Sequence, residues 1–269
     1  ILGGGLAFGA VTLMLGIVRL PYGQEVIFVI SMTVVVSLLR LTIAEIDHEI
    51  RRTIVYAAIV IFVFRAMPAV GPGAQWWQID VLGFDPAFFG ALAQLGTGLA
   101  IAGTWLFSGA ITHRPVTTVL VWLTIVGGAL SLPTIGLYYG LQEWTEARFG
   151  FGARTIALVD TSLASPFAQL SVIPMLTLIA IHAPSGRRAT WFALMASLMN
   201  LALAAGGLVT KYLNQIFVVE RGHYDALGHL MIAAMLIGVV VPLATIAIIG
   251  PKLRTKPAPT TAVGTERRR

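Results

Sequence analysis

Long apolar runs, separated by short polar or glycine- and proline-containing connections, occupy almost the whole chain. Each run has the length at which an α-helix crosses the hydrocarbon core of a bilayer, about 18–25 residues or more. We therefore predict eight transmembrane helices, over roughly residues 1–18, 23–44, 53–71, 87–108, 116–139, 153–182, 190–218 and 225–250. The polar residues 251–269, rich in proline and threonine, are predicted to form a disordered tail.

The composition places the chain in the class of all-α polytopic membrane bundles. Of its 269 residues, 57% are hydrophobic and 11% are charged, and the mean hydropathy is +0.85. A soluble domain carries about a quarter charged residues and has no room to bury this much apolar surface. Six of the 18 Lys and Arg lie in the last eighteen residues, so the net charge of +6 reflects a tail and loops rather than a nucleic-acid surface.

Several kinds of chemistry are missing from the sequence. Without cysteine there is no disulfide, thiolate metal site or cysteine nucleophile, and no phosphate-binding loop or H-E-x-x-H motif occurs. We interpret His223, Asp225 and His229 as parts of a solvated loop rather than as a metal site. The sequence thus predicts neither an enzyme, nor a cofactor, nor a bound metal.

The basic residues in the loops predict the orientation of the chain. Arg51, Arg52, Arg114, Arg187, Arg188 and six tail residues fall on one side, whereas Arg19, Arg148, Arg154 and Arg221 fall on the other. Cytoplasmic loops carry the excess of Lys and Arg. We therefore expect a plasma (inner) membrane protein with a cytoplasmic C-terminus, and an outer interfacial belt that includes Trp76, Trp77 and Trp144.

Three residues are candidates for charges inside the hydrocarbon core: Arg65, Asp160 and Lys211. A charge at the bilayer centre costs roughly 2.5–3.5 kcal/mol on insertion scales, so it usually faces a cavity or a partner. Counting along ideal helices places Arg65 about 18 Å and Asp160 about 21 Å above the inner face. The two depths permit a pair across a cavity, although a static salt bridge and snorkelling to the outer interface remain alternatives. Lys211 lies near an outer helix end and is expected to snorkel.

Polar and helix-breaking residues accompany these charges. Pro166 removes a backbone hydrogen bond and is expected to bend the helix between Asp160 and Gln169. Asn200 lies near the middle of its span, where it either bridges two helices or contacts a solute. The abundant glycines fit close helix packing, with hinges as the alternative.

Two regions resemble the folate–biopterin transporter family of the major facilitator superfamily. The matching residues are Ala66, Pro68, Leu82, Gly83, Phe84, Pro86, Phe89 and Gly90 in the first region, and Asp160, Gln169, Pro174, Gly186, Ala189, Thr190, Phe192, Ala193, Leu194 and Asn200 in the second. The resemblance implies that the eight spans are helices five to twelve of twelve, so we expect four further helices before Ile1. It also places Arg65 and Asp160 on the seventh and tenth helices, which line the central cavity of the superfamily.

The hypothesis from the sequence is a secondary active transporter of a small solute, such as a folate or pterin, that works by alternating access and is coupled to protons. Its candidate solute- or proton-binding residues are Arg65, Asp160, Gln169, Asn200 and Gln94. We expect residues 1–50 to end an N-terminal half-bundle and residues 51–250 to form a C-terminal six-helix half-bundle, with 251–269 as the tail. The expected partners are the solute, protons and lipid, in a monomer. The alternatives are an exporter of a drug or metabolite, and a non-transporting assembly or delivery factor, in which Arg65 and Asp160 would pair permanently.

Overall fold

The computed structural model describes residues 22–253, except 113, 169, 171, 182, 184, 185 and 187, and describes no side chain at 108, 110–112 and 168. The first predicted span, residues 254–269 of the predicted tail and Gln169 therefore lie outside the described residues, whereas residues 251–253, predicted as tail, belong to α12. The elements are α2 (Gly23–Ile43), α3 (His48–Arg65), α4 (Pro72–Asp80), α5 (Pro86–Thr112), α6 (Val116–Leu130), α7 (Leu132–Tyr138), α8 (Leu141–Phe149), α9 (Ala153–Ala168), α10 (Val172–Ile181), α11 (Arg188–Ile216) and α12 (Leu227–Leu253).

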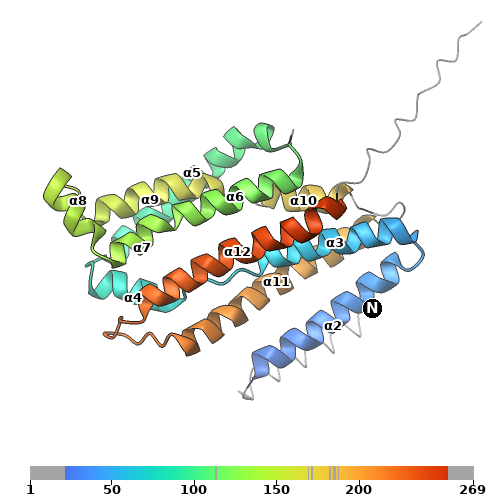
Figure 1. Ribbon diagram of the computed structural model, residues 1–269, viewed down its shortest axis with the longest axis horizontal. Helices are drawn as coiled ribbons and strands as arrows, with labels where there is room; N and C mark the ends of the chain where they lie inside the picture. The colour runs from blue at the N-terminus through green and yellow to red at the C-terminus, as the bar shows by residue number, and fades with distance from the viewer. Residues whose placement is uncertain are drawn as a thin grey trace, which may run out of the picture.

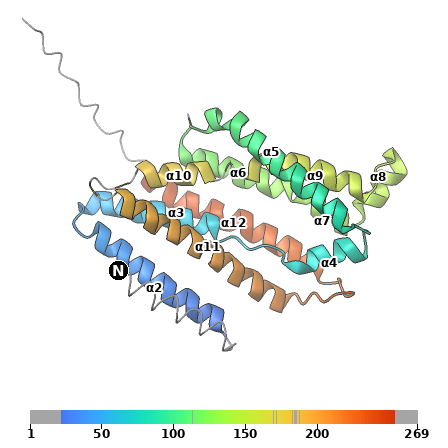
Figure 2. The same ribbon diagram turned by 180° about the vertical axis from the view of Figure 1, so that it is seen from behind.

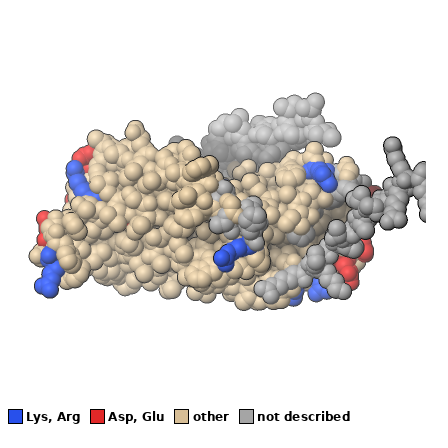
Figure 3. Space-filling model, turned by 90° about the horizontal axis from the view of Figure 1, so that it is seen from above, with Lys and Arg blue, Asp and Glu red and all other residues tan. Residues whose placement is uncertain are grey.

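The helices run along the long axis of a single elongated bundle (Figure 1). Within the described part, six segments are long and apolar enough to cross a membrane: Gly23–Ile43, Pro86–Phe107, Val116–Tyr138, Ala153–Ile181, Arg188–Ile216 and Leu227–Leu253. Figure 3 shows one face as a broad, largely uncharged belt with the acidic side chains gathered toward its two ends. The chain is thus an all-helical, polytopic integral membrane protein, as its composition predicts.

The two ends of the bundle hold different elements. One end, called the α8 end below, holds α4, α7 and α8, and α2, α5, α9 and α12 begin toward it. The other, the α10 end, holds α10 and the start of α3 and α11. Helix α2 lies at one edge of the bundle beside α11, and α5 lies at the opposite edge beside α9 (Figure 2).

The third predicted span is broken in the structure. Helix α3 begins earlier than predicted, at His48, and ends at Arg65, so residues 66–71 are not helical. Pro68 explains the end of the helix, because a proline pushes the preceding residue away from helical backbone angles. Gly71 has φ +89°, a left-handed value that glycine adopts at little cost, and Pro72 then starts α4.

Helix α11 provides hydrogen-bond partners for backbone groups of the non-helical residues 66–71. The N–H of Ala69 donates to the Thr210 hydroxyl (2.9 Å), and the Asn214 side chain donates to the carbonyl of Val70 (3.1 Å). One turn before Thr210, Gly206 lets the backbone of the break approach α11, because an added Cβ would lie 2.7 Å from the Met67 carbonyl oxygen. Residues 206, 210 and 214 share one helical face. Non-helical backbone at membrane depth is tolerated where protein groups satisfy it in this way.

Substitution of Gly206 by valine should therefore push the non-helical residues 66–71 away from α11. Backbone atoms in contact cannot move aside as a flexible side chain does, and overpacking of this kind costs about 1–3 kcal/mol or more. Thermal unfolding of the purified full-length protein should show a clear fall in Tm. Gly207→Val is the matched control, because it makes the same change in helix propensity while a Cβ at Gly207 meets no atom within 4 Å. Equal Tm values for the two variants would contradict the assigned role of Gly206.

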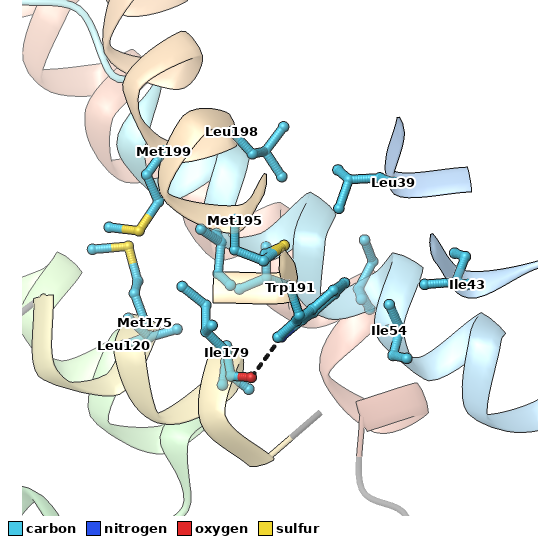
Figure 4. Packing of buried hydrophobic residues seen from close by; sticks show 14 of the residues in the cluster. Leu39, Ile43, Ile54, Leu120, Met175, Ile179, Trp191, Met195, Leu198 and Met199 are labelled. Carbon is cyan, nitrogen blue, oxygen red and sulfur yellow. Dashed lines mark hydrogen bonds between the residues drawn. The ribbon is translucent and has the colours of Figure 1, made fainter. Parts of the chain in front are cut away.

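The core consists of two apolar clusters. Near the α10 end, Trp191 is only 1% exposed and its indole N–H donates to the carbonyl of Ile179 (2.8 Å), among the side chains of Ile54, Met175 and Met195 (Figure 4). Near the α8 end, a second cluster is formed by Trp77, Leu137, Leu213, Leu227, Leu230, Met231 and Ala234. Five segments contribute to both clusters or to the residues packed against them: α3–α4, α6–α7, α9–α10, α11 and α12.

Two predicted connections are helices. Helices α4 and α8 fall in stretches that were expected to be loops, and their short, mixed polar sequences do not have the apolar length of a span. The expectation that Trp77 belongs to an interfacial belt is wrong: it is 4% exposed and its ring lies 5.6 Å from that of Tyr138. Trp144 on α8 is 60% exposed, as a belt residue would be.

An exposed cluster ties α4 to the connection between α11 and α12. The guanidinium of Arg221 donates two hydrogen bonds to the Asp80 carboxylate (3.0 and 3.2 Å), and the Tyr224 hydroxyl donates a third. The Arg221 guanidinium, followed by the Tyr224 hydroxyl, lowers the pKa of Asp80. A lowered folded-state pKa gives stability that is present above the unfolded pKa and lost as the pH falls through the folded value.

The lowered pKa of Asp80 predicts how the thermal stability of Arg221→Gln should depend on pH. The variant should melt at a lower temperature than the wild type by a small and constant margin from about pH 7 to about pH 5. The margin should begin to shrink as the pH falls below about 4, the ordinary pKa of a carboxyl group, and vanish below the lowered pKa that Asp80 has in the folded wild type. Tm values across this pH series check it, with Arg148→Gln on α8 as an exposed control. A margin that grew on acidification would show that Asp80 does not carry the effect.

Candidate functional site

The candidate site lies between the two core clusters, where a cavity of about 250 Å³ separates α3, α6 and α12. Along α12, Leu230 and Ala234 belong to the cluster at the α8 end, Met235 to Pro242 line the cavity, and Ile246 belongs to the cluster at the α10 end. The segments α3–α4 and α6–α7 show the same order. The cavity is thus at mid-level in the bundle, with packed apolar residues toward either end.

Glycines allow this cavity to form at a close helix crossing. A Cβ on Gly128 would lie 2.5 Å from Cγ2 of Val239, so Gly128 lets α6 and α12 touch. Its neighbour Gly127 also lines the cavity, but a Cβ there meets nothing within 4 Å. Gly128 therefore has the packing role expected of glycine in these spans, while Gly127 leaves open space.

Arg65 is adjacent in the chain to cavity-lining residues of α3 but does not itself line the cavity. It is the last residue of α3, directly after Phe64 and two residues before Met67, which both line the cavity. Its side chain is half-buried, and its Nε is buried without a hydrogen-bond partner. A guanidinium at a helix C-terminus interacts favourably with the helix dipole, and the unused Nε–H leaves it able to donate to a further group.

Asp160 lies on α9, next to the start of α7. The Thr134 hydroxyl donates to Oδ2 of Asp160 (2.9 Å), and Thr134 is one turn beyond Ser131, which lines the cavity. The other carboxylate oxygen, Oδ1, is buried and accepts no hydrogen bond. An ionised carboxylate that lacks a cation and half of its hydrogen bonds is costly inside a bundle. Asp160 is therefore placed to take up a proton or to meet a polar group.

Arg65 and Asp160 do not form the pair that their predicted depths permit. The ion pairs within 4 Å that join described residues to each other are Arg154–Asp85, Lys211–Glu25 and Arg221–Asp80, and neither residue takes part in them. Instead, Arg65 directly follows the lining residue Phe64, whereas Asp160 is connected through the Thr134 hydroxyl to the segment that contains the lining residue Ser131. The permanent Arg65–Asp160 salt bridge expected of a non-transporting assembly factor is thus absent.

The other predicted site residues are not assembled around Asp160. Gln94 is exposed on α5, two residues before Gly96, which faces Ser165 of α9, so Gln94 lies on the far side of the helix. Asn200 is exposed on α11 and lines a separate space of about 330 Å³ against Ser31 and Val34 of α2. Gln169 falls outside the described residues.

Lys211 has a partner that the sequence analysis missed. Instead of only snorkelling, its ammonium lies 2.6 Å from a carboxylate oxygen of Glu25, in the first turn of α2. The Tyr212 hydroxyl donates to the same oxygen (2.9 Å). The sequence contained a signal for this pair, since Glu25 and Lys211 lie near the same predicted side of the membrane. Depth alone, however, does not say which helices are neighbours.

Thr134 and Ser131 were also missed. Hydroxyl residues in apolar helices commonly donate a hydrogen bond to the carbonyl four residues earlier, as Thr124 does to Leu120 (2.8 Å). A Ser or Thr in such a helix is therefore not by itself a sign of a site. Thr134 differs only because α7 lies beside α9. Among the described residues, no group of three or more His, Asp or Glu is placed to hold a metal ion.

Comparisons with known proteins agree with this architecture. A model of the BT1 family matches residues 15–258. The chain is 27% identical over 186 residues to the folate-biopterin transporter of Synechocystis sp. (strain ATCC 27184 / PCC 6803 / Kazusa), and the alignment covers 68% of this chain and 36% of that protein. The chain thus spans little more than a third of the length of this curated relative. No solved structure matches the chain.

Proposed function

The chain belongs to the BT1 family, a family of transporters rather than enzymes, and on that premise we propose that it is part of a secondary active transporter for a folate or pterin. Family membership over residues 15–258 is the observation that carries the proposal. The name of the Synechocystis relative supports the solute class. Because the alignment covers 36% of that relative, the activity proposed is that of the full-length protein.

We propose that the solute occupies the mid-level cavity during an alternating-access cycle. Arg65 is the candidate group for a solute carboxylate, because a guanidinium binds a carboxylate with two parallel hydrogen bonds. Asp160 is the candidate proton-binding group, with Thr134 orienting its carboxylate. Ser131 and Thr124 add hydroxyls to the cavity wall, and the break between α3 and α4 gives α3 an end that can move separately from α4. The half-buried, incompletely bonded state of both charges supports these roles.

The proposed arrangement in the membrane follows from the basic residues. The α10 end would face the cytoplasm, and the C-terminal tail would lie on that side, in the plasma (inner) membrane. Helix α2 would end the N-terminal half-bundle, and α3 to α12 would form the C-terminal half-bundle of a major facilitator fold, in a monomer. Proton coupling is part of the proposal because Asp160 is a carboxylate inside a candidate membrane span, with one oxygen buried and unbonded.

Uptake by the full-length protein in proteoliposomes tests this function. Labelled folate and labelled biopterin are each offered with and without an inward proton gradient. The proposal predicts uptake of at least one of them, increased by the gradient and abolished when the gradient is collapsed. Transport of an unrelated drug or metabolite with no uptake of either compound would favour the exporter. No transport of any compound in a broad screen would overturn the transporter proposal.

A further inference from the structure

A second cavity, distinct from the candidate solute site, lies between α2, α3 and α11 and measures about 350 Å³. Its wall includes Met32, Val36 and Ile43 of α2, Ala58 and Phe62 of α3, and Trp191 and Leu198 of α11. The twelve residues from Met32 to Ile43 extend it over about 16 Å along the helix axis. An acyl chain in one leaflet of a bilayer covers a comparable depth, since a leaflet core is about 15 Å thick.

Arg40 is the one charged residue among the side chains that line this groove. It lies in the last turn of α2, at the α10 end, and it is exposed. Its guanidinium makes no hydrogen bond or ion pair with a described residue, in contrast to Arg51, which donates to the carbonyls of Ala44 and Ile46, and Arg52, which donates to Tyr56. A cation that pairs with no described residue therefore stands at the α10 end of an apolar groove.

We propose that this groove binds an anionic phospholipid, with an acyl chain along α2 and the headgroup phosphate on Arg40. A water-soluble ligand of this size would need several polar contacts to fix it, and the wall offers none besides the guanidinium. Basic residues beside apolar grooves at the cytoplasmic surface are the pattern that recognises anionic headgroups.

The same combination recurs elsewhere at the α10 end. A cavity of about 380 Å³ between α5, α6 and α9 is lined by apolar residues such as Phe107, Trp122 and Phe167, together with Arg114, in the loop before α6. Its lining shares no residue with the α2–α3–α11 groove. Arg114 therefore provides a matched comparison: it is a basic residue at an apolar cavity of similar size on the other side of the bundle.

Photo-crosslinking in proteoliposomes tests the proposal. The full-length protein is reconstituted in phosphatidylcholine that contains a small fraction of either phosphatidylglycerol or phosphatidylcholine carrying a diazirine in its acyl chain, and the labelled peptides are mapped by mass spectrometry. Phosphatidylglycerol should label residues 32–43 and 54–62 about fivefold more than phosphatidylcholine, the preference that one basic side chain near a bilayer provides. Arg40→Gln should remove this preference, while Arg114→Gln should leave it unchanged.

Further measurements separate the lipid from other occupants. Excess inorganic phosphate should not reduce the labelling, because free phosphate lacks the acyl chain. Ala58→Phe, which fills the groove and retains Arg40, should reduce the labelling of both segments. Equal labelling by the two lipids, unchanged labelling in Arg40→Gln, or competition by phosphate would each overturn the proposal. No labelling by either lipid, which is expected if another segment of the chain fills the groove, would overturn it as well.

Discussion

Asp160→Asn in the full-length protein is expected to reduce solute uptake at least about tenfold, the effect of losing 1.4 kcal/mol of interaction, without loss of the fold. An asparagine has the same shape, and its carbonyl oxygen can accept the hydrogen bond from Thr134 that Oδ2 of Asp160 accepts now. What the variant loses is the ability to carry a charge and to exchange a proton. Since a buried carboxylate with an unbonded oxygen is a cost to the fold, Tm should stay the same or rise.

The pH profile distinguishes proton coupling from a purely structural role. Uptake by the wild type should rise as the external solution is acidified, whereas the residual uptake of Asp160→Asn should not change with pH. Thr134→Val serves as the comparison, because it removes the hydrogen bond but keeps the carboxylate, so it should alter the profile without flattening it. Equal uptake by the wild type and Asp160→Asn at every pH would remove Asp160 from the coupling mechanism.

Gly103→Val is expected to have the largest effect on folding. At Gly103, in the middle of α5, an added Cβ would lie 2.5 Å from the Cα of Pro166 and 2.6 Å from its carbonyl oxygen, both backbone atoms of α9. The α5–α9 contact is the most extensive between helices in the described part of the chain. A branched side chain would force these helices apart, at a cost of about 3 kcal/mol or more.

Size-exclusion profiles and Tm values of the purified full-length protein check this expectation. Gly98→Val, five residues earlier on the same helix, is the matched control, since a Cβ there meets no atom within 4 Å and the residue is exposed. The control should yield a monodisperse protein with a nearly unchanged Tm, and Gly103→Val a poor yield or a large fall in Tm. Similar behaviour of the two variants would mean that α5 and α9 do not cross at Gly103.

The spans were predictable because a bilayer imposes their length and apolar character. The runs at 23–44, 87–108 and 225–250 correspond closely to α2, α5 and α12. The end of α3 at Arg65 was not predicted, because the apolar run continues to residue 71 and the cost of leaving the helix at Pro68 is offset by hydrogen bonds from a distant helix, α11. Helices α4 and α8 were missed because their polar composition resembles that of loops.

The candidate site was predictable in depth but not in lateral arrangement. Depth follows from counting residues along a helix, and this places Arg65 and Asp160 at a common level. Which helices are neighbours depends on packing across the bundle, so the Thr134 hydroxyl next to Asp160 and the Glu25 carboxylate next to Lys211 appear only in three dimensions. For the same reason, the sequence did not show that Gln94 and Asn200 lie on helix faces turned away from α9.

Each end of the bundle contains an apolar cluster, but the ion pairs are distributed unevenly between the two ends. The three ion pairs that join described side chains to one another all lie toward the α8 end, whereas the described packing at the α10 end centres on Trp191 and its apolar neighbours. Dissolved ions weaken exposed charge pairs, with a screening length of about 10 Å at 0.1 M, but leave apolar contacts intact. Raising the ionic strength should thus loosen contacts at the α8 end, whereas raising the amphiphile concentration should act on the apolar clusters at both ends.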